Sequence, residues 1–320
     1  SDRDASVAEV VPEREHVLGV GAASVSLLSA APTSPASRVL DLGTGSGVQA
    51  VAQARTADVV VATDVHPRAL ALAEATQAAN QVHNVELRQG SWFAPVAGER
   101  FERIVANPPF VVGSPEIGHV YRDSGLSLDG ATQLVVSQAA DHLVDDGIAC
   151  ILGAWVHTSE TTWTTRVASW LPAAGVSAWV LQRDVVDPGM YVSTWLEDES
   201  IDLRSDTARQ RSVAWLDFFA EHDVSAVGFG WIFIQRTGQS PSEVTAEELR
   251  HPFVDPLGPE AEEYFLRAAW LRDRTEQDVL NATYCVRPGV AVEDVQLPDA
   301  TRKMGFVPEV MRVTRTDGPR

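Results

Sequence analysis

Lysine is almost missing from this chain of 320 residues. Lys303 is the only lysine, and 25 basic residues stand against 44 acidic ones, for a net charge of −19. A chain this acidic is a poor general binder of polyanions, because attraction to phosphates supplies most non-specific affinity for nucleic acids. The charge therefore lowers the expectation of a nucleic-acid substrate without excluding one, since a local basic patch would override it.

Cysteine is scarce as well. Cys150 and Cys285 lie far apart and form no CxxC pair, and the eight histidines are scattered without an HxxxH pattern. The chain therefore has neither a disulfide framework nor a zinc motif. From these absences we expect a reducing, cytoplasmic setting and a site without metal.

Long apolar runs are also absent. No stretch of about 18 apolar residues is present, which predicts that no helix crosses a membrane. Residues 1–10 lack the basic-then-apolar order of a signal peptide, although the chain begins with Ser1 and so leaves its natural start open. With 45% hydrophobic residues, the composition suits a globular protein with one large domain, alone or with an appendage.

Short apolar segments alternate with helical ones through most of the chain, as in a parallel α/β sheet. Strands are expected at 38–42, 59–63, 85–88, 101–106, 147–155, 176–181 and 224–236. Helices are expected at 47–55, 67–80, 128–143, 161–171 and 207–221, after a short helix that ends near residue 30. The pattern predicts a doubly wound, Rossmann-like, seven-stranded, mostly parallel sheet with an antiparallel last strand.

The pattern also divides the chain into three regions. Residues 1–35 are expected to form an N-terminal extension and linker, 36–238 the α/β domain, and 239–320 a small C-terminal subdomain. Within these regions, 184–206 is predicted to be an irregular insertion and 239–259 linker-like. A helix near 260–280 and short strands are expected to form the C-terminal appendage.

A glycine-rich loop follows the first predicted strand. The chain reads VLDLGTGSG from Val39, which places Gly43, Gly45 and Gly47 between a strand and a helix. Glycine allows a tight turn and a close approach to a ligand without a Cβ collision. The alternative is a plain strand-to-helix turn. The GTGSG spacing differs from the GxGxxG of nicotinamide-dinucleotide proteins, which makes an NAD-binding protein the weaker interpretation.

Two aspartates strengthen the ligand-binding interpretation of this loop. Asp41 lies inside the first strand, immediately before the loop, where a carboxylate costs free energy unless it meets a partner such as an ammonium group or loop amides. Asp64 ends the second strand, about 20 residues after the glycine loop, where an acidic residue can accept hydrogen bonds from two ribose hydroxyls. It suits an adenosine-containing cofactor without a 2′-phosphate, whereas the alternative is a helix cap.

The tetrapeptide Asn107-Pro108-Pro109-Phe110 follows the fourth predicted strand. The two prolines fix φ and remove two donors, so that carbonyl groups are left exposed, and Asn107 adds a side-chain carbonyl. The Asn107 side chain and the Pro108 carbonyl are placed to accept both hydrogens of an NH2 group, which aims its lone pair at a methyl sulfonium. Phe110 adds a flat face for a planar group. The alternative is a plain turn, because Asn-Pro often begins one.

These motifs resemble the class I S-adenosylmethionine-dependent methyltransferases, specifically the amino-methyltransferases with an NPPY or NPPF motif. Two branches are most similar, the small-domain ribosomal RNA guanine-N2 enzymes and the release-factor glutamine-N5 enzymes, and the resemblance covers about residues 16–155. It implies that 36–238 is the methyltransferase domain, with Asn107, Pro108, Pro109 and Phe110 holding the target nitrogen. It implies the cofactor contacts Asp41, Gly43, Thr44, Gly45, Gly47, Asp64, Val65, Ser91, Trp92 and Asn107.

Two departures from the family pattern limit the assignment. An acidic residue follows the third strand in many relatives, but here Ser91 takes that place, with Ser91 and the indole of Trp92 as substitutes. The glutamine-modifying branch tends to carry a Pro-Arg segment and a helical domain ahead of the fold. This chain has a glycine pair within 19–24 instead. The pair either lines the cofactor pocket or only marks the start of a helix.

Four weaker candidates lie outside these motifs. The segment 111–128 contains Tyr121 and Arg122 and is expected either to cover the site or to be a surface connection. Trp155, His157 and the segment 191–195 either wall a site for a flat substrate or belong to the core.

The function expected is N-methylation by S-adenosylmethionine, which leaves S-adenosylhomocysteine. RNA or a protein glutamine is the expected acceptor from the resemblance, while the acidic charge favours a protein or a small molecule. A non-catalytic module of the same fold and an NAD-linked oxidoreductase are the alternatives.

Overall fold

The structure is a computed structural model that describes residues 17, 19–113, 125–199, 201–249 and 256–315. The chain divides into two compact units, Ser1–Glu248 and Leu249–Arg320, which are considered separately below.

An eight-stranded sheet with the strand order β3-β2-β1-β4-β5-β7-β6-β8 forms the first unit. Its strands are β1 (Ala36–Leu42), β2 (Ala57–Asp64), β3 (Val85–Gln89), β4 (Phe101–Ala106), β5 (Leu143–His157), β6 (Ala174–Val186), β7 (Ala226–Pro241) and β8 (Glu243–Glu248). Strands β1 to β5 pair in parallel, whereas β7 runs antiparallel to β5 and β6 on either side. The doubly wound, mostly parallel sheet expected from the alternation is confirmed.

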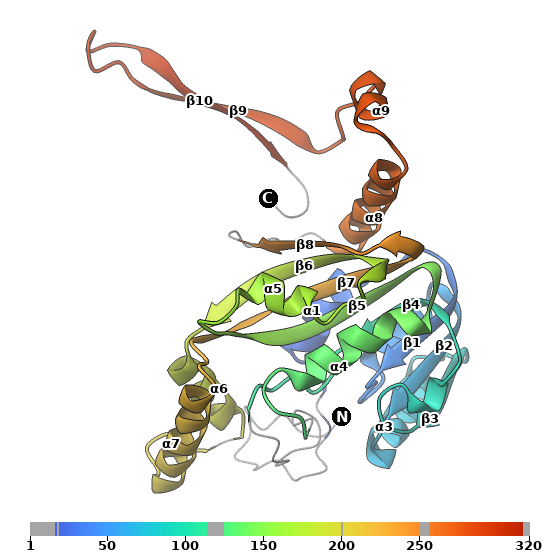
Figure 1. Cartoon of the computed structure of the whole chain (residues 1–320). Coiled ribbons are helices and arrows are strands. Elements are labelled where there is room, and N and C mark those ends of the chain that lie inside the picture. Colours follow the sequence, from blue (N-terminus) through green and yellow to red (C-terminus); the bar gives the residue numbers. More distant parts are fainter. Residues whose placement is uncertain (1–16, 18, 114–124, 200, 250–255, 316–320) are drawn as a thin grey trace. The chain divides into compact units, whose positions relative to one another are not determined.

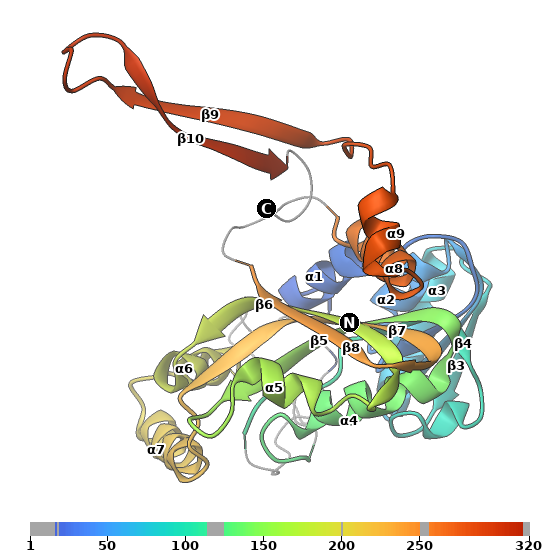
Figure 2. The same ribbon diagram turned by 45° about the horizontal axis from the view of Figure 1, so that its top comes forward.

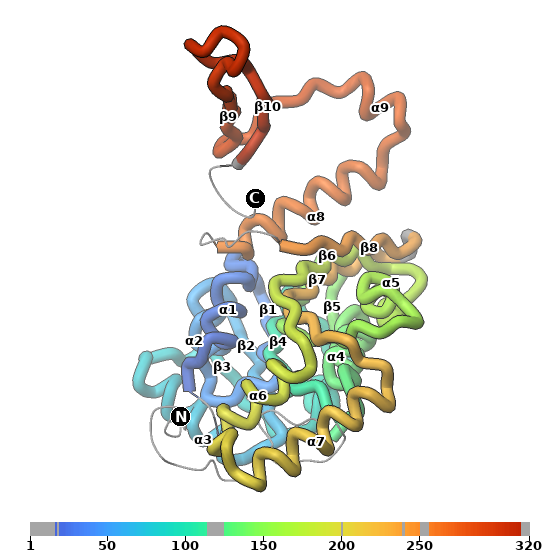
Figure 3. The backbone as a smooth tube through the Cα atoms, turned by 90° about the vertical axis from the view of Figure 1, so that its left-hand side faces the viewer, coloured from blue at the N-terminus to red at the C-terminus, as the bar shows by residue number. Residues whose placement is uncertain are grey.

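Helices cover both faces of this sheet, as Figures 1 and 2 show. The helices of the unit are α1 (Ala22–Ala30), α2 (Val48–Gln53), α3 (Pro67–Ala79), α4 (Gly130–Ala139), α5 (Trp163–Ala168), α6 (Pro188–Asp198) and α7 (Asp206–Glu221), with short 3-10 turns at Ala94–Val96 and Ala140–His142. Helices α1 to α3 lie on one face, and α4 and α5 on the other (Figure 3). Helices α6 and α7 form a pair at one end of β6 and β7 (Figure 1).

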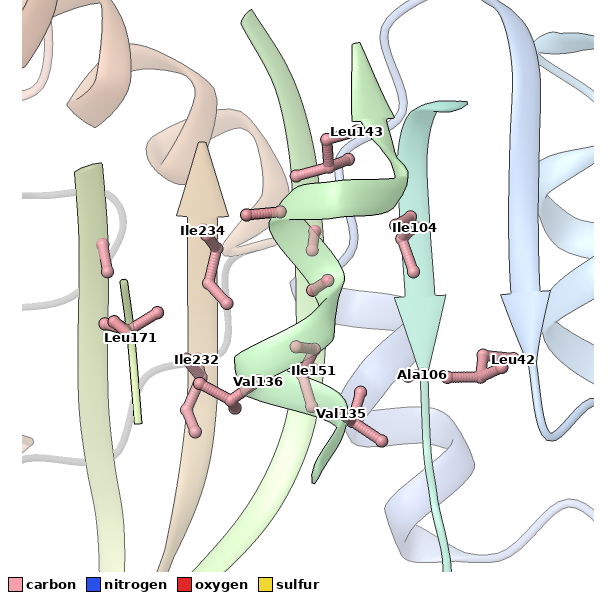
Figure 4. Packing of buried hydrophobic residues seen from close by; sticks show 14 of the residues in the cluster. Leu42, Ile104, Ala106, Val135, Val136, Leu143, Ile151, Leu171, Ile232 and Ile234 are labelled. Atoms are coloured by element: carbon pink, nitrogen blue, oxygen red, sulfur yellow. The ribbon is translucent and has the colours of Figure 1, made fainter. Parts of the chain in front are cut away.

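The core forms because the central strands carry apolar residues on both faces, as strands covered by helices on both sides must. Toward α4 and α5, Ile104, Ile151 and Ile232 are fully buried in one large cluster (Figure 4). Val39 and Val60 are buried in a smaller cluster with Ala50 of α2. The strands that support the glycine loop and the Asn-Pro-Pro-Phe segment are therefore packed on both sides.

Two expectations for the second half of this unit were wrong. Residues 184–206 were expected to be irregular, but they contain helix α6, which Asp187 caps by accepting a hydrogen bond from the backbone N–H of Met190 at 3.0 Å. Residues 239–248 were expected to be linker-like, but they complete β7 and form β8, an eighth strand parallel to β6. Helix α6 has its own cap and buries Tyr191, Val192 and Leu196, whereas the polar segment of β8 becomes regular only by pairing with β6.

The second unit contains two helices and one hairpin. Helix α8 (Gly258–Arg272) precedes α9 (Glu276–Asn281), which begins with a capping box between Thr275 and Asp278. Strands β9 (Val290–Pro298) and β10 (Phe306–Arg315) pair antiparallel into a two-stranded sheet of their own. The helix near 260–280 and the short strands expected for the appendage are both present, with the helix split in two.

Candidate active site

Parallel pairing brings the sequence motifs to one edge of the sheet. Leu42 of β1 pairs with Ala106 of β4, so Gly43 and Asn107, the residues that follow, lie next to each other. A Cβ added to Gly43 would lie 4.0 Å from the backbone oxygen of Asn107. The glycine loop and the Asn-Pro-Pro-Phe segment therefore meet at the carboxyl edge, where open α/β sheets bind their ligands.

The glycine loop adopts a conformation that requires glycine. Gly43, Gly45 and Gly47 have φ values of 74°, 55° and 84°, in the left-handed region that other residues rarely occupy. The backbone N–H groups of Gly43 and Thr44 both donate to the carbonyl of Thr63, at 3.0 and 2.8 Å. The loop is thereby held against the end of β2.

Asp41 is a buried carboxylate at the end of β1. Its side chain accepts a hydrogen bond from the Thr44 hydroxyl at 2.6 Å, and only 1% of the residue is exposed. Burial raises the pKa of this carboxyl from 3.8 to about 7, against the smaller lowering effect of Thr44. A carboxylate with so high a pKa favours a nearby positive charge, which would restore its ionised form.

Asp64 holds the loops that follow β1 and β2. One carboxylate oxygen accepts from the backbone N–H of Gly45 and the other from that of His66, both at 2.9 Å. Burial raises the pKa of this carboxyl, and these backbone hydrogen bonds oppose the rise. The cap of helix α3 is His66, whose side chain accepts from Arg68, so Asp64 does not serve as the helix cap that was one interpretation of it.

The residues expected to contact an adenine ring follow β2 and β3. Val65 is exposed, Ser91 is exposed and Trp92 is half-buried with a left-handed φ of 49°. The backbone N–H of Gly90 donates to the carbonyl of Asp64 at 3.0 Å, which joins these two loops. The structure thus places all three residues on the same edge as the glycine loop.

Asn107 carries the most informative polar atom of the site. Its side-chain oxygen Oδ1 is buried and has no hydrogen-bond partner in the described part of the chain. A buried polar atom without a partner is rare, because it loses its hydration without compensation. A donor from a bound molecule would satisfy this oxygen.

Phe110 ends the tetrapeptide among aromatic side chains, one of which, Trp195, lies in the segment 191–195 that was expected either to wall the site or to belong to the core. Its ring meets those of Trp195 on α6 and Phe229 on β7 edge to face, each with a centroid distance of 6.4 Å. Both neighbours are half-buried. Phe229 on β7 is far from Phe110 in the chain and gave no local signal, whereas the segment that contains Trp195 was one of the weaker candidates.

The weaker candidates have different outcomes. Trp155 is fully buried, stacks on Trp163 at 5.6 Å and donates to Gln182 at 2.9 Å, so it belongs to the core. His157 contacts Gln182 at 2.8 Å. Of the segment 111–128, the part with Tyr121 and Arg122 lies outside the described residues. The segment 191–195 lies on helix α6.

The edge fits a cofactor with a cation and a ribose. It offers a buried carboxylate, a second carboxylate at the end of the next strand, and a loop where a Cβ at Gly45 would meet no atom within 4 Å. Among the described residues, no group of three or more His, Cys, Asp or Glu side chains is arranged to hold a metal ion. In the same part of the chain, no helix is both long and apolar enough to span a membrane.

Comparison with known proteins agrees with this geometry. Residues 18–154 match the family model of the methyltransferase small domain, and residues 262–320 match a family described as a domain of unknown function. A release factor glutamine methyltransferase of Aliivibrio fischeri is 34% identical over 133 residues, which cover 39% of this chain and 45% of that protein. The Escherichia coli protein of the same name is 40% identical over 76 residues, 23% of this chain and 27% of its own length. The chain thus matches less than half the length of either.

Solved structures with a similar arrangement include two proteins described as RNA-modifying. A 16S rRNA N2 methyltransferase from T. thermophilus, in complex with AdoMet and guanosine, has a TM-score of 0.36 and 23% identity over 47% of this chain and 38% of its own. An rRNA methylase from Streptococcus thermophilus has a TM-score of 0.37 and 13% identity over 68% of this chain and 95% of its own.

The sheet order, the glycine loop and the family match define the class: the chain contains a class I S-adenosylmethionine-dependent methyltransferase domain. Within that class, residues 18–154 match the methyltransferase small domain. S-adenosylmethionine, the cofactor expected from the sequence, is the methyl donor of this class.

Proposed function

We propose that the protein transfers a methyl group from S-adenosylmethionine to an exocyclic amino or amide nitrogen, of a protein glutamine or of RNA, and releases S-adenosylhomocysteine. The observation that carries the proposal is Oδ1 of Asn107, which is buried beside the glycine loop and has no hydrogen-bond partner among the described residues. An NH2 group is the donor that satisfies this oxygen and leaves a nitrogen lone pair for the transfer.

The donor side of the site holds the cofactor in this proposal. Asp41 faces the ammonium group of the methionine part, and the loop residues Gly43, Thr44, Gly45 and Gly47 approach it closely. Asp64 accepts the ribose hydroxyls, since each of its oxygens keeps acceptor capacity beyond its backbone hydrogen bond. Val65, Ser91 and Trp92 flank the adenine.

The acceptor side positions the target nitrogen. Asn107 Oδ1 and the Pro108 carbonyl each accept a hydrogen of the NH2 group, Pro109 keeps the turn rigid, and Phe110 supports the planar group that carries it. Bound S-adenosylmethionine would supply the methyl group, and its sulfur would keep the electron pair of the carbon–sulfur bond that breaks as the nitrogen–carbon bond forms. The surplus proton of the nitrogen leaves to solvent, and positioning supplies most of the acceleration.

A protein glutamine is the first acceptor to test. Curated relatives of this region are described as release factor glutamine methyltransferases. The charge points in the same direction, because residues 1–248 carry 15 basic and 32 acidic residues, a net charge of −17 that repels RNA phosphates. Residues 249–320 carry ten basic and twelve acidic residues, a net charge of −2. RNA is therefore the second candidate.

Two further proposals concern the rest of the chain. We propose that the catalytic domain, expected at 36–238, extends through β8 to residue 248 after an extension at 1–35, and that 249–320 form an accessory region. A cytoplasmic setting is proposed from the two cysteines, one buried and one exposed and neither in a disulfide.

Calorimetric titration with S-adenosylmethionine tests the donor side. We expect binding by the wild type and at least tenfold weaker binding by Asp64→Ala, because the ribose loses its acceptor. Asp223→Ala is the matched control, since this exposed aspartate also accepts a backbone N–H, that of Ser159 at 2.7 Å, on a different loop. Absence of binding, or equal binding by both variants, contradicts the proposal.

Labelled S-adenosylmethionine tests the acceptor side. Protein and RNA fractions of a bacterial lysate are incubated separately with the enzyme, and we expect the label in a glutamine-containing peptide. Label in RNA would make RNA the acceptor. Binding of S-adenosylmethionine without any transfer would instead support a non-catalytic module, and enhanced NADH fluorescence would support an oxidoreductase.

A further inference from the structure

Helices α6 and α7 hold the backbone that follows the Asn-Pro-Pro-Phe segment. The backbone N–H of Val112 donates to the phenol oxygen of Tyr191 on α6 at 2.6 Å. The backbone carbonyl of the same residue accepts from the indole N–H of Trp215 on α7 at 3.2 Å. Both backbone groups of one residue are thus bound by side chains 79 and 103 positions further along the chain.

The two side chains also support each other. The rings of Tyr191 and Trp215 meet edge to face with a centroid distance of 6.0 Å, and Tyr191 stacks on Phe229 at 5.8 Å with an interplanar angle of 21°. Phe229 in turn meets the ring of Phe110. A continuous set of aromatic contacts therefore runs from the helix pair to the last residue of the tetrapeptide.

The connection to the tetrapeptide is short. Val112 lies two residues after Phe110, so a shift of its backbone displaces the Phe110 ring. Gly113 follows, and a Cβ there would lie 3.0 Å from the indole nitrogen of Trp215, so glycine leaves room for this approach. The carbonyl of Gly113 also accepts from the backbone N–H of Leu128 at 2.8 Å, which fixes the far end of the segment.

We infer that the α6–α7 helix pair belongs to the acceptor side of the site, with Tyr191 and Trp215 as positioning residues that set the place of the Asn107–Phe110 segment through Val112. This inference rests on the proposed function, since it names what positions the acceptor motif. Trp195 and Phe229 complete the arrangement by fixing the plane of the Phe110 ring.

Simple packing does not require these polar atoms. Tyr191 is 1% exposed within an otherwise apolar cluster, where phenylalanine would fill almost the same volume. With phenylalanine, the buried Val112 N–H would lose this acceptor, and an unsatisfied buried donor is costly. The phenol oxygen therefore has a local effect on the backbone that hydrophobic packing alone does not supply.

Hydrogen exchange measured by mass spectrometry tests the inference without any methyl transfer. In Tyr191→Phe and in Trp215→Phe, peptides covering 107–113 are expected to exchange about tenfold faster, because the backbone of Val112 opens more often. Peptides covering 101–106 of β4 are expected to keep their wild-type exchange. Tyr284→Phe is the matched control, since its phenol also bonds a backbone group, the carbonyl of Val279 in the second unit.

Kinetics provide the second readout. With the methyl-accepting lysate fraction, Tyr191→Phe is expected to lower kcat about tenfold and to change the KM for S-adenosylmethionine less than twofold, because displaced acceptor groups cost rate rather than donor affinity. In a double-mutant cycle, Tyr191→Phe and Phe110→Leu are expected to be non-additive, since both act on one segment.

The outcomes separate the two proposals. Unchanged exchange at 107–113 in both variants overturns the inference, whether or not methyl transfer is observed. A rate loss that is fully additive with Phe110→Leu overturns it as well. Faster exchange in the variants of a protein that binds no S-adenosylmethionine would support the positioning role while contradicting the proposed function.

Discussion

The two sides of the site are held by contacts of very different range. On the donor side, the side-chain hydrogen bonds of Asp41 and Asp64 join residues that are 3, 2 and 19 positions apart. On the acceptor side, the hydrogen bonds of Val112 join residues 79 and 103 positions apart. The donor loop is therefore built mainly by its own sequence, whereas the acceptor segment depends on a helix pair inserted far downstream.

This difference implies a difference in vulnerability. Local hydrogen bonds form again whenever β1 and β2 pair, so a change at the donor side is expected to act on the loop itself. The acceptor segment needs the whole unit to be folded, since α6, α7 and β7 must all be in place. Four changes test this contrast, from the largest expected effect to the smallest.

The pH dependence of stability tests the donor side through Asp41. The folded-state pKa of about 7 exceeds the ordinary 3.8, so the folded protein binds more protons than the unfolded chain between these values. The free energy of unfolding is therefore expected to fall as the pH rises from about 4 to 7, by up to about 4 kcal/mol. Asp41→Asn is expected to lack this slope, as measured by urea unfolding at several pH values. Asp223→Asn should keep it, and an unchanged slope in Asp41→Asn would contradict the assignment.

Asn107→Ala tests the acceptor side directly. We expect methyl transfer to fall about 100-fold, because one transition-state hydrogen bond to the target nitrogen is lost. Affinity for S-adenosylmethionine is expected to change less than twofold. Asn84→Ala is the control, since this asparagine bonds the carbonyls of Ala54 and Ala57 and should lower the melting temperature without affecting the rate. An intact transfer rate in Asn107→Ala would refute the proposed mechanism.

Arg166→Ala tests a long-range ion pair, Arg166–Asp129, in the part of the first unit that follows the acceptor segment. Arg166 on α5 donates two hydrogen bonds of 2.6 Å to Asp129, which is buried and also accepts the backbone N–H of Val156. Loss of the cation leaves a buried carboxylate without its partner, and we expect about 3 kcal/mol lower stability in denaturant unfolding. Arg209→Ala, which breaks an exposed pair with Asp206, is expected to cost less than about 0.5 kcal/mol. Equal losses would indicate that the pair is unimportant.

Gly47→Ala is the smallest and most local change. Gly47 has a φ of 84°, and a Cβ there would lie 3.0 Å from the Cα of Ala73. Strain and crowding are expected to lower the stability by about 1–2 kcal/mol and to weaken binding of S-adenosylmethionine. Gly21→Ala is the control, because no atom lies within 4 Å of its Cβ position, and a thermal melt should show little change.

Most of the fold could be predicted from the sequence. The strand at 101–106 was predicted at its observed bounds, and the other strands of the expected seven were found with ends displaced by several residues at most. Strand β2 is nearly a pure run of valine and alanine, and the centres of β4, β5 and β7 are mostly apolar, which leaves few alternatives. By contrast, α6 was missed although Asp187 caps it locally, and β8 was missed because its polar segment becomes regular only by pairing with β6.

The sequence by itself determined the donor side, since glycines at a fixed spacing and acids at two strand ends act within a few residues or across one strand pair. It also identified the Asn107–Phe110 segment, because two prolines fix the backbone locally. Only the tertiary structure decided what surrounds that segment. Val112, Tyr191 and Trp215 carry no joint signal in the chain, and they meet because β7 inserts between β5 and β6 and brings the helix pair back to the edge of the sheet.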